Sequence, residues 1–292
     1  MSKDILALIQ SNMSGFSKGQ KLIANFILSS YDKAAFMTAS RLGKTVNVSE
    51  STVVRFAAEL GYDGYPAMQK ALQEMIRNKL TSIQRIEVSN DRIGQQDILS
   101  MVLQADMEKI RMTLEETDRK GFDGAVDAIL SARRIYILGV RSAAAIASFL
   151  GFYFNLIFEN VTLVNTASAS EIFEQLLRVR EGDVVIGVSF PRYSRRTVKA
   201  LEFAHDQGAT VVAITDSEAS PLAGIADHAL LAKSDMASFV DSLVAPLSLV
   251  NALIVAVSRR KDNDLAATFE ALEHIWDEYQ VYEKVDQKAE EQ

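Results

Sequence analysis

The sequence contains no cysteine at all. This absence excludes a disulfide framework, a cysteine nucleophile and any metal site built from thiolates. Neither a G-x-G-x-x-G motif nor a P-loop is found, which disfavours a nucleotide-binding protein.

Long hydrophobic runs are also missing. One apolar stretch, at 243–257, is interrupted by Pro246, Ser248 and Asn251, and it is shorter than the roughly 20 residues that a membrane span needs. We therefore interpret it as part of a buried or subunit-interface helix. Since the first residues have no continuous apolar core, they do not resemble a secretory signal, and we expect a cytoplasmic protein.

Charge is distributed unevenly along the chain. The formal net charge is −7, yet residues 1–80 carry 10 Lys and Arg against 6 Asp and Glu. The remainder carries 21 basic against 32 acidic residues. Because nucleic acid attracts cations through counterion release, the N-terminal part is the candidate DNA-binding region.

The pattern of apolar residues divides the 292-residue chain into two domains, in line with roughly 150 residues per domain. Helical spacing predicts an all-α domain over 1–77. The polar stretch 78–96 shows no strong period and is interpreted as a linker. The second domain is expected over 97–292.

Short apolar runs alternate with helical patterns in this second domain, which predicts βαβ units and a five-stranded parallel sheet flanked by helices. Runs without polar alternation are typical of strands that are covered on both faces. The last two helices are expected at 239–259 and 265–279. The strands are predicted at 134–138, 161–165, 184–188, 210–214 and 228–231.

Residues 38–56 have the pattern of a helix-turn-helix. Gly43 provides the small residue where the two helices cross, and Asn47 tolerates the left-handed turn position. Ser49 is predicted to cap the second helix, and Gly61 to end it. The inward apolar positions are Leu42, Val46, Val48, Val53 and Phe56.

The start of the second helix enters the major groove in this motif. Arg55 can contact guanine with two hydrogen bonds, and Arg41 and Lys44 are candidate phosphate contacts. An alternative is a helical pair that only packs. The predicted DNA-binding residues are Arg41, Lys44, Ser49, Glu50, Ser51, Thr52 and Arg55.

Two serine-containing loops follow strands of the second domain. Gly139 allows a sharp turn from strand to helix, and Ser142 then lies at a helix N-terminus, which attracts anions. Ser189 and Ser194 flank a second such turn. Two loops of this kind at the carboxyl ends of strands predict a phosphate-binding site. Alternatively, these serines are ordinary helix caps.

The chain resembles the RpiR family of transcription regulators, whose second half is a SIS (sugar isomerase) domain. The resemblance spans about 1–280 and is carried by VSESTVVRFAAELGY at 48–62, GVRSA at 139–143 and the segment 183–231. It implies a DNA-binding regulator of carbohydrate metabolism, with operator DNA and a phosphorylated sugar effector as partners. No cofactor, metal ion, membrane or catalytic residue is implied.

The match departs from the family at the loop where SIS domains have Ser-x-Ser-Gly-Glu-Thr. Ser189 is retained and Ser194 keeps a hydroxyl, whereas Pro191 loses a hydroxyl and an N–H donor. Arg192 and Tyr193 take the glycine and glutamate places. The effector-binding residues that we expect are Arg141, Ser142, Glu171, Ser189, Arg192 and Ser194.

A sugar-phosphate isomerase with a helical extension is the alternative function, and it would need a general base. Glu171, and less favourably Glu174, could serve, although a contact to sugar hydroxyls suits Glu171 equally well. The replacement of the loop glutamate by Tyr193 favours binding without turnover. The pattern places His205, on a helix, and His274, on a terminal helix, far from both loops, while His228 begins the last strand.

Two further expectations concern assembly and ligand charge. The apolar helix at 239–259 predicts a homodimer or homotetramer, because a single core face requires fewer apolar residues. The two loops carry four arginines, Arg141, Arg192, Arg195 and Arg196, which suit a second anionic group such as a carboxylate. Alternatively, Arg195 and Arg196 point to solvent.

Overall fold

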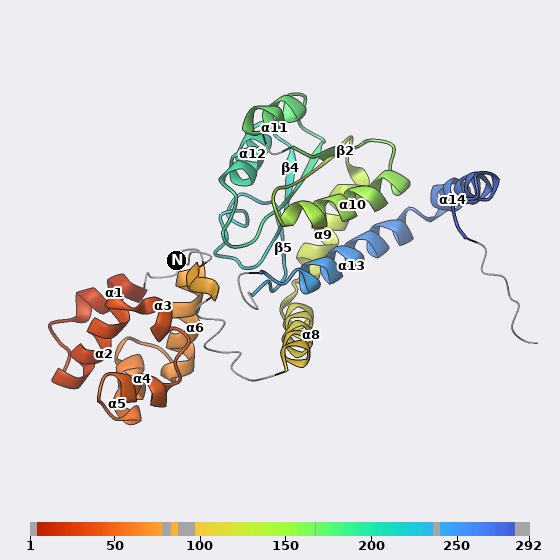
Figure 1. The fold of residues 1–292 in the computed structure, drawn as a ribbon. Coiled ribbons are helices and arrows are strands. Elements are labelled where there is room, and N and C mark those ends of the chain that lie inside the picture. The colour runs from red at the N-terminus through yellow and green to blue at the C-terminus, as the bar shows by residue number, and fades with distance from the viewer. Residues whose placement is uncertain (1–4, 78–82, 87–96, 167, 236–239, 284–292) are drawn as a thin grey trace, which may run out of the picture.

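The computed structural model describes residues 5–77, 83–86, 97–166, 168–235 and 240–283. Figure 1 shows a cluster of helices at the N-terminal end and an α/β region beyond it. The predicted fold class, a helical N-terminal part followed by a five-stranded parallel sheet with flanking helices, is confirmed. The N-terminal helices are α1 (Ile5–Asn12), α2 (Lys18–Ser29), α3 (Tyr31–Ala34), α4 (Ala39–Thr45), α5 (Glu50–Glu59) and α6 (Gly64–Arg77).

These N-terminal helices enclose one apolar core. Ser17 and Gln20 form the capping box that starts α2, so the buried face of α2 points inward from its first turn. Tyr65 on α6 is buried, and its hydroxyl donates to the carbonyl oxygen of Met37 at 2.7 Å. Burial raises the pKa of this phenol to about 12. The core includes Ile9, Ile23, Ile27, Leu42, Val53, Phe56, Met68 and Leu72.

All strands of the second region pair in parallel, in the order β2-β1-β3-β4-β5. The predicted strand positions agree with the structure to within one residue. The central strands are buried throughout, as runs without alternation require. The strands are β1 (Ile135–Gly139), β2 (Val161–Val164), β3 (Val184–Val188), β4 (Thr210–Thr215) and β5 (His228–Leu231).

Helices cover both faces of the sheet (Figure 1). One core contains residues of α9, α10 and α13, and the opposite core contains residues of α11 and α12. Helix α8 packs against α13. The helices are α8 (Ile98–Glu116), α9 (Arg119–Ser131), α10 (Ala143–Ile157), α11 (Ala169–Leu176), α12 (Arg195–Asp206), α13 (Val244–Arg260) and α14 (Asp262–Glu278).

One helix begins later than the sequence-based expectation. The helix expected at 239–259 begins at Val244, and Phe239 lies outside the described residues. The segment 78–96 is predicted to be a linker, and its described part, 83–86, forms a helical turn. None of the helices that the structure describes combines the length and the apolar character of a membrane span.

Candidate functional site

Helices α4 and α5 form the predicted helix-turn-helix. A Cβ on Gly43 would lie 2.8 Å from the carbonyl oxygen of Val48, so only glycine lets the two helices approach this closely. Asn47 has a φ of 57°, the left-handed conformation that the turn requires. Ser49 caps α5, because its hydroxyl accepts the N–H of Thr52 at 3.3 Å.

The residues predicted to contact DNA lie on the outer surface of this pair. Arg55 is exposed and lies one turn along α5 from Ser51, while Thr52 is half-buried. The Ser49 hydroxyl also lies 2.9 Å from that of Ser51 and 2.8 Å from that of Thr52, so its first role is to order the helix start. The exposed candidates are Arg41, Lys44, Ser49, Glu50, Ser51 and Arg55.

The N-terminal turn of α2 adds residues to this surface that sequence reasoning missed. Gly19 approaches Thr52 and Val48 at the start of α5, since a Cβ placed on it would lie 3.4 Å and 3.5 Å from their side-chain carbons. The neighbouring Lys18 and Lys21 are both exposed. The capping box of Ser17 and Gln20 sets the start of α2, but no local sequence pattern placed that start beside α5.

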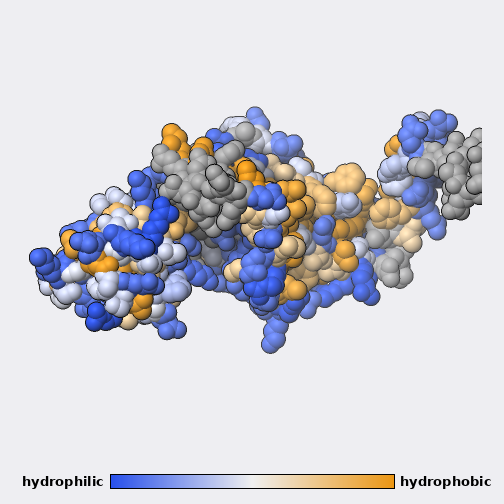
Figure 2. Space-filling model, turned by 60° about the horizontal axis from the view of Figure 1, so that its bottom comes forward, coloured by the Kyte–Doolittle hydropathy of each residue, from blue (hydrophilic) through white to orange (hydrophobic). Residues whose placement is uncertain are grey.

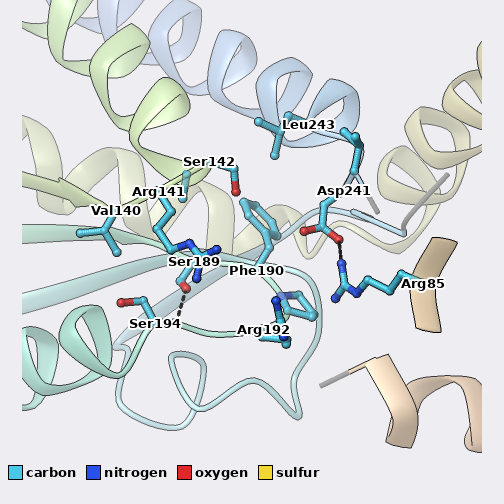
Figure 3. A pocket seen from close by; sticks show the side chains of 13 residues that line it. Arg85, Val140, Arg141, Ser142, Ser189, Phe190, Arg192, Ser194, Asp241 and Leu243 are labelled. Carbon is cyan, nitrogen blue, oxygen red and sulfur yellow. Dashed lines mark hydrogen bonds and ion pairs between the residues drawn. The ribbon is translucent and has the colours of Figure 1, made fainter. Parts of the chain in front are cut away.

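A cavity of about 400 Å³ opens at the carboxyl ends of β1 and β3. Figure 3 shows Arg141 reaching toward Ser189, with Ser142 and Ser194 nearby. The two loops therefore come together as the parallel sheet predicts. The predicted residues that line this cavity are Arg141, Ser142, Ser189, Arg192 and Ser194.

The loop after β1 holds a serine whose hydroxyl takes no part in capping. Gly139 is required by packing, because a Cβ there would lie 2.7 Å from the carbonyl oxygen of Ala143. Arg141 has a φ of 58°. Ser142 occupies the N-cap position of α10, is exposed, and makes no side-chain capping bond. Its hydroxyl faces the cavity rather than the helix (Figure 3).

In the loop after β3, both serine hydroxyls accept backbone hydrogen bonds within the loop and the start of α12. The N–H of Ser194 donates to Ser189 Oγ at 3.0 Å, and the N–H of Thr197 donates to Ser194 Oγ at 3.3 Å. Ser194 is thus the helix cap that the alternative interpretation described. Each accepting hydroxyl retains its hydrogen as a donor. Tyr193, in the glutamate place, donates to Asp216 Oδ1 at 2.8 Å.

A second cavity of about 490 Å³ adjoins these loops. Arg141, Arg192 and Ser194 line both cavities. Arg195 and Arg196 are exposed, yet both line the second cavity. The arginines of the two loops are therefore gathered around one region at the end of the sheet.

Glu171 is the predicted effector residue that the structure places apart. It is exposed on the first turn of α11 and accepts a hydrogen bond from Thr166. Thr166 lines the second cavity, whereas Glu171 lines neither. None of the three histidines lines them either; His228 packs against Gly124 on α9, and His274 lies 3.9 Å from Glu278.

Two charged residues that sequence reasoning missed also line the first cavity. Arg85 belongs to the helical turn at 83–86, and Asp241 precedes α13. Arg85 Nη1 donates to Asp241 Oδ1 at 2.8 Å. No short-range motif links these positions, because they lie 156 residues apart in the sequence. In the described part of the chain, no three His, Asp or Glu side chains are grouped to hold a metal ion.

Family profiles match both halves of the chain. The profile described as "Helix-turn-helix domain, rpiR family" matches residues 3–79, and that of the SIS domain matches residues 128–256. The sugar isomerase domain of an RpiR transcription factor from Sphaerobacter thermophilus is 32% identical, with a TM-score of 0.59. The match covers 61% of this chain and 99% of that one. This chain belongs to the RpiR family.

Full-length relatives of this RpiR-family chain are named transcriptional regulators. HexR of Escherichia coli is 24% identical over 267 residues, which cover 88% of this chain and 89% of that protein. NanR of Vibrio vulnificus, solved in complex with ManNAc-6P, shares the fold with a TM-score of 0.59 at 22% identity, covering 96% and 99% of the two chains. The chain is a transcriptional regulator with an N-terminal helix-turn-helix and a SIS domain.

Proposed function

We propose that this regulator reads operator DNA with α5 and that a phosphorylated sugar, bound between the β1 and β3 loops, controls its activity. The observation that carries the effector assignment is the first cavity. There the hydroxyl of Ser142, which makes no capping bond, faces the same space as Arg141 and Arg192.

The β1 loop supplies the phosphate-binding chemistry in this proposal. The first N–H groups of a helix have no intrahelical acceptor, and the helix dipole favours negative charge at that end. Helix α10 begins at Ala143, directly after Ser142. A phosphate placed there would accept hydrogen bonds from the start of α10, from Ser142 and from the hydroxyls of Ser189 and Ser194.

DNA recognition in this proposal divides between base and backbone contacts. Arg55 contacts a guanine, and Ser51 and Thr52 bond base edges or phosphates at the start of α5. Arg41, Lys44 and Glu50 lie beside them, and Lys18 on α2 extends the row of exposed cations next to α5. Phosphate contacts fix the register on the duplex, and base contacts select the sequence.

The gathering of arginines at the second cavity supports an effector with a second anionic group. Arg141 and Arg192 adjoin both cavities, and Arg195 and Arg196 line the second. A forked guanidinium suits a carboxylate. We expect 6-phosphogluconate to bind more tightly than sorbitol 6-phosphate. Arg192→Ala should remove most of this preference, and equal affinities of the unmodified protein for both ligands would contradict it.

The proposal treats the SIS domain as a sensor rather than an isomerase. Isomerisation needs a base within hydrogen-bonding reach of the sugar. The described residues that line the two cavities include no histidine and one carboxylate, Asp241. Asp241 is held by Arg85. Glu171 lines neither cavity and accepts a hydrogen bond from Thr166, so it is not placed to act as this base.

Assembly into a homodimer or homotetramer belongs to the same proposal. The predicted interface on α13 keeps exposed apolar side chains at Val244 and Val255, and the exposed apolar side of α8 offers a second candidate interface. Leu99, Met107 and Leu114 are 67%, 63% and 60% exposed, and Figure 2 shows apolar side chains gathered over the middle of the molecule. A dimer would present two reading helices to a palindromic operator. Sedimentation as a monomer at micromolar concentration would contradict it.

A thermal-shift screen tests the effector assignment. Each sugar phosphate is paired with its unphosphorylated sugar, because a ligand that binds only the folded state raises the unfolding midpoint. We expect stabilisation by phosphorylated members alone. Equal stabilisation by both members of every pair, or by neither, would contradict the proposal that the cavity binds a phosphate group.

A further inference from the structure

The ion pair between Arg85 and Asp241 lies in the wall of the first cavity. Figure 3 shows Arg85 and Asp241 on one side of this cavity and Ser142, Ser189 and Ser194 on the other. The Arg85 side chain is 5% exposed and that of Asp241 is 21% exposed. A guanidinium buried to this extent needs an anionic partner, since an uncompensated buried charge is strongly unfavourable.

The two partners of this pair differ in what they offer to an anionic ligand. Arg85 is a fixed cation with a planar set of donors, the geometry that suits carboxylate and phosphate oxygens. Asp241 carries the same sign of charge as the ligand and repels it at close range. One side chain of the pair thus attracts the ligand, and the other competes with it for the same guanidinium.

We propose that Arg85 is an effector-binding residue and that ligand binding exchanges the carboxylate of Asp241 for an anionic group of the ligand. This inference rests on the proposed function of the cavity, and it adds a ligand contact from outside the SIS core. Asp241 is a counter-ion of Arg85 in the cavity wall before the ligand binds.

The position of Arg85 in the chain gives this exchange a consequence. The helical turn at 83–86 lies between α6, the last helix of the N-terminal domain, and α8. A ligand that binds Arg85 therefore contacts the segment that connects the SIS domain to the DNA-binding helices. If this segment has two arrangements, the protein binds the ligand more tightly in one of them. Such a difference in affinity is what couples the effector cavity to the DNA-binding helices.

Two charge-removing substitutions, of which Asp241→Asn is isosteric, test the exchange because they predict changes of opposite sign. Isothermal titration calorimetry is performed with inorganic phosphate and with glucose 6-phosphate. Arg85→Gln should weaken binding of both probes by about tenfold, the value of one charge-assisted hydrogen bond. Asp241→Asn should tighten binding by about threefold, because a repelling and competing charge is removed. Arg85→Lys should retain part of the affinity.

An exposed arginine provides the matched control. Arg111 on α8 is 55% exposed and pairs with Glu108, so Arg111→Gln should leave both affinities unchanged. Circular dichroism and the melting midpoint establish that each variant is folded. If the ion pair only stabilises the folded chain, Arg85→Gln and Asp241→Asn will change the affinity for the two probes in the same direction or not at all. Either result overturns the inference.

The outcome separates this inference from the proposed function. If the unmodified protein binds the probes but the two variants do not change the affinity in opposite directions, the proposed role of Arg85 is wrong. The cavity would then remain the proposed effector site. Failure of the unmodified protein to bind either probe removes both.

Discussion

The surface of α5 that we propose to contact DNA and the cavity of the SIS domain present their candidate residues in different ways. On α5, the side chains predicted to contact DNA are already exposed, with only Thr52 half-buried. In the cavity, Ser142 makes no capping bond, whereas Ser189 and Ser194 accept backbone N–H groups of their own loop. The candidate DNA-contacting residues thus come from the adjacent helices α4 and α5, while the cavity depends on loops from separate parts of the sheet.

This difference follows from where the residues lie in the sequence. The helix-turn-helix draws its capping serine, its turn residue and its reading residues from one short segment, so local spacing defines them. The cavity combines the segments around Ser142, Ser189 and Asp241 with Arg85. The two serine loops of this site could be predicted from the parallel sheet, whereas the contribution of Arg85 and Asp241 is seen only in the structure.

The largest effect is expected at the crossing of α4 and α5. Gly43→Val would drive side-chain atoms into the carbonyl oxygen of Val48, which is part of the backbone and cannot rotate away. We expect a loss of about 3 kcal/mol, at the upper end of overpacking. Gly61→Ala is the control, since Gly61 has a φ of 86° but open space around it, and its cost should be about 1 kcal/mol.

Urea denaturation followed by circular dichroism measures both variants. If Gly43→Val costs no more than Gly61→Ala, the close approach of the two helices is not what requires glycine at position 43.

The next effect concerns sequence reading. Arg55→Ala should cost about 2 kcal/mol on a selected DNA site and little on random DNA, because a bidentate base contact is lost. Lys44→Ala should weaken both by a similar factor, because a phosphate contact has no sequence preference. Fluorescence anisotropy on both DNAs, at one salt concentration, measures the difference. Equal losses for Arg55→Ala on both DNAs would assign it to phosphate.

The two serine loops give the third prediction. Ser194→Ala removes a helix cap and should lower stability by about 1 kcal/mol. Ser142→Ala removes a hydroxyl that caps nothing, so it should leave the melting midpoint unchanged and weaken sugar-phosphate binding. Thermal melts with and without ligand separate the two. A lower midpoint for Ser142→Ala without ligand would show that its hydroxyl belongs to the fold.

A comparably small effect is expected from Tyr65, which belongs to the core of the N-terminal helices. Tyr65→Phe should cost about 1 kcal/mol through the lost hydrogen bond to Met37. Because burial raises its pKa to about 12, the folded state retains the proton where an ordinary tyrosine, with a pKa of about 10, loses it. Stability should therefore fall between about pH 10 and pH 12, and Tyr65→Phe should weaken this fall. An identical pH profile for both proteins would contradict the assignment.

Sequence patterns predicted the five strands and the helix-turn-helix because each depends on short-range periodicity and capping. Gly139 was expected to serve a sharp turn, but the structure shows that close packing on Ala143 requires it. The helical turn at 83–86 had no periodic pattern in the sequence. Its residue Arg85 pairs with Asp241, which is 156 residues away, so no local pattern could indicate this contact. The sequence also could not show which serine hydroxyl caps a helix. Ser142 and Ser194 both precede a helix, but only the Ser194 hydroxyl makes a capping hydrogen bond.

Ligand-dependent DNA binding tests the central claim most directly. A DNA fragment selected for tight binding is titrated with the unmodified protein, with and without the sugar phosphate that gives the largest thermal shift. We predict that this ligand changes the DNA dissociation constant by at least about fivefold, the lower range of allosteric coupling, and that its unphosphorylated sugar does not. A sugar phosphate that saturates the protein yet leaves the DNA affinity unchanged would contradict the account.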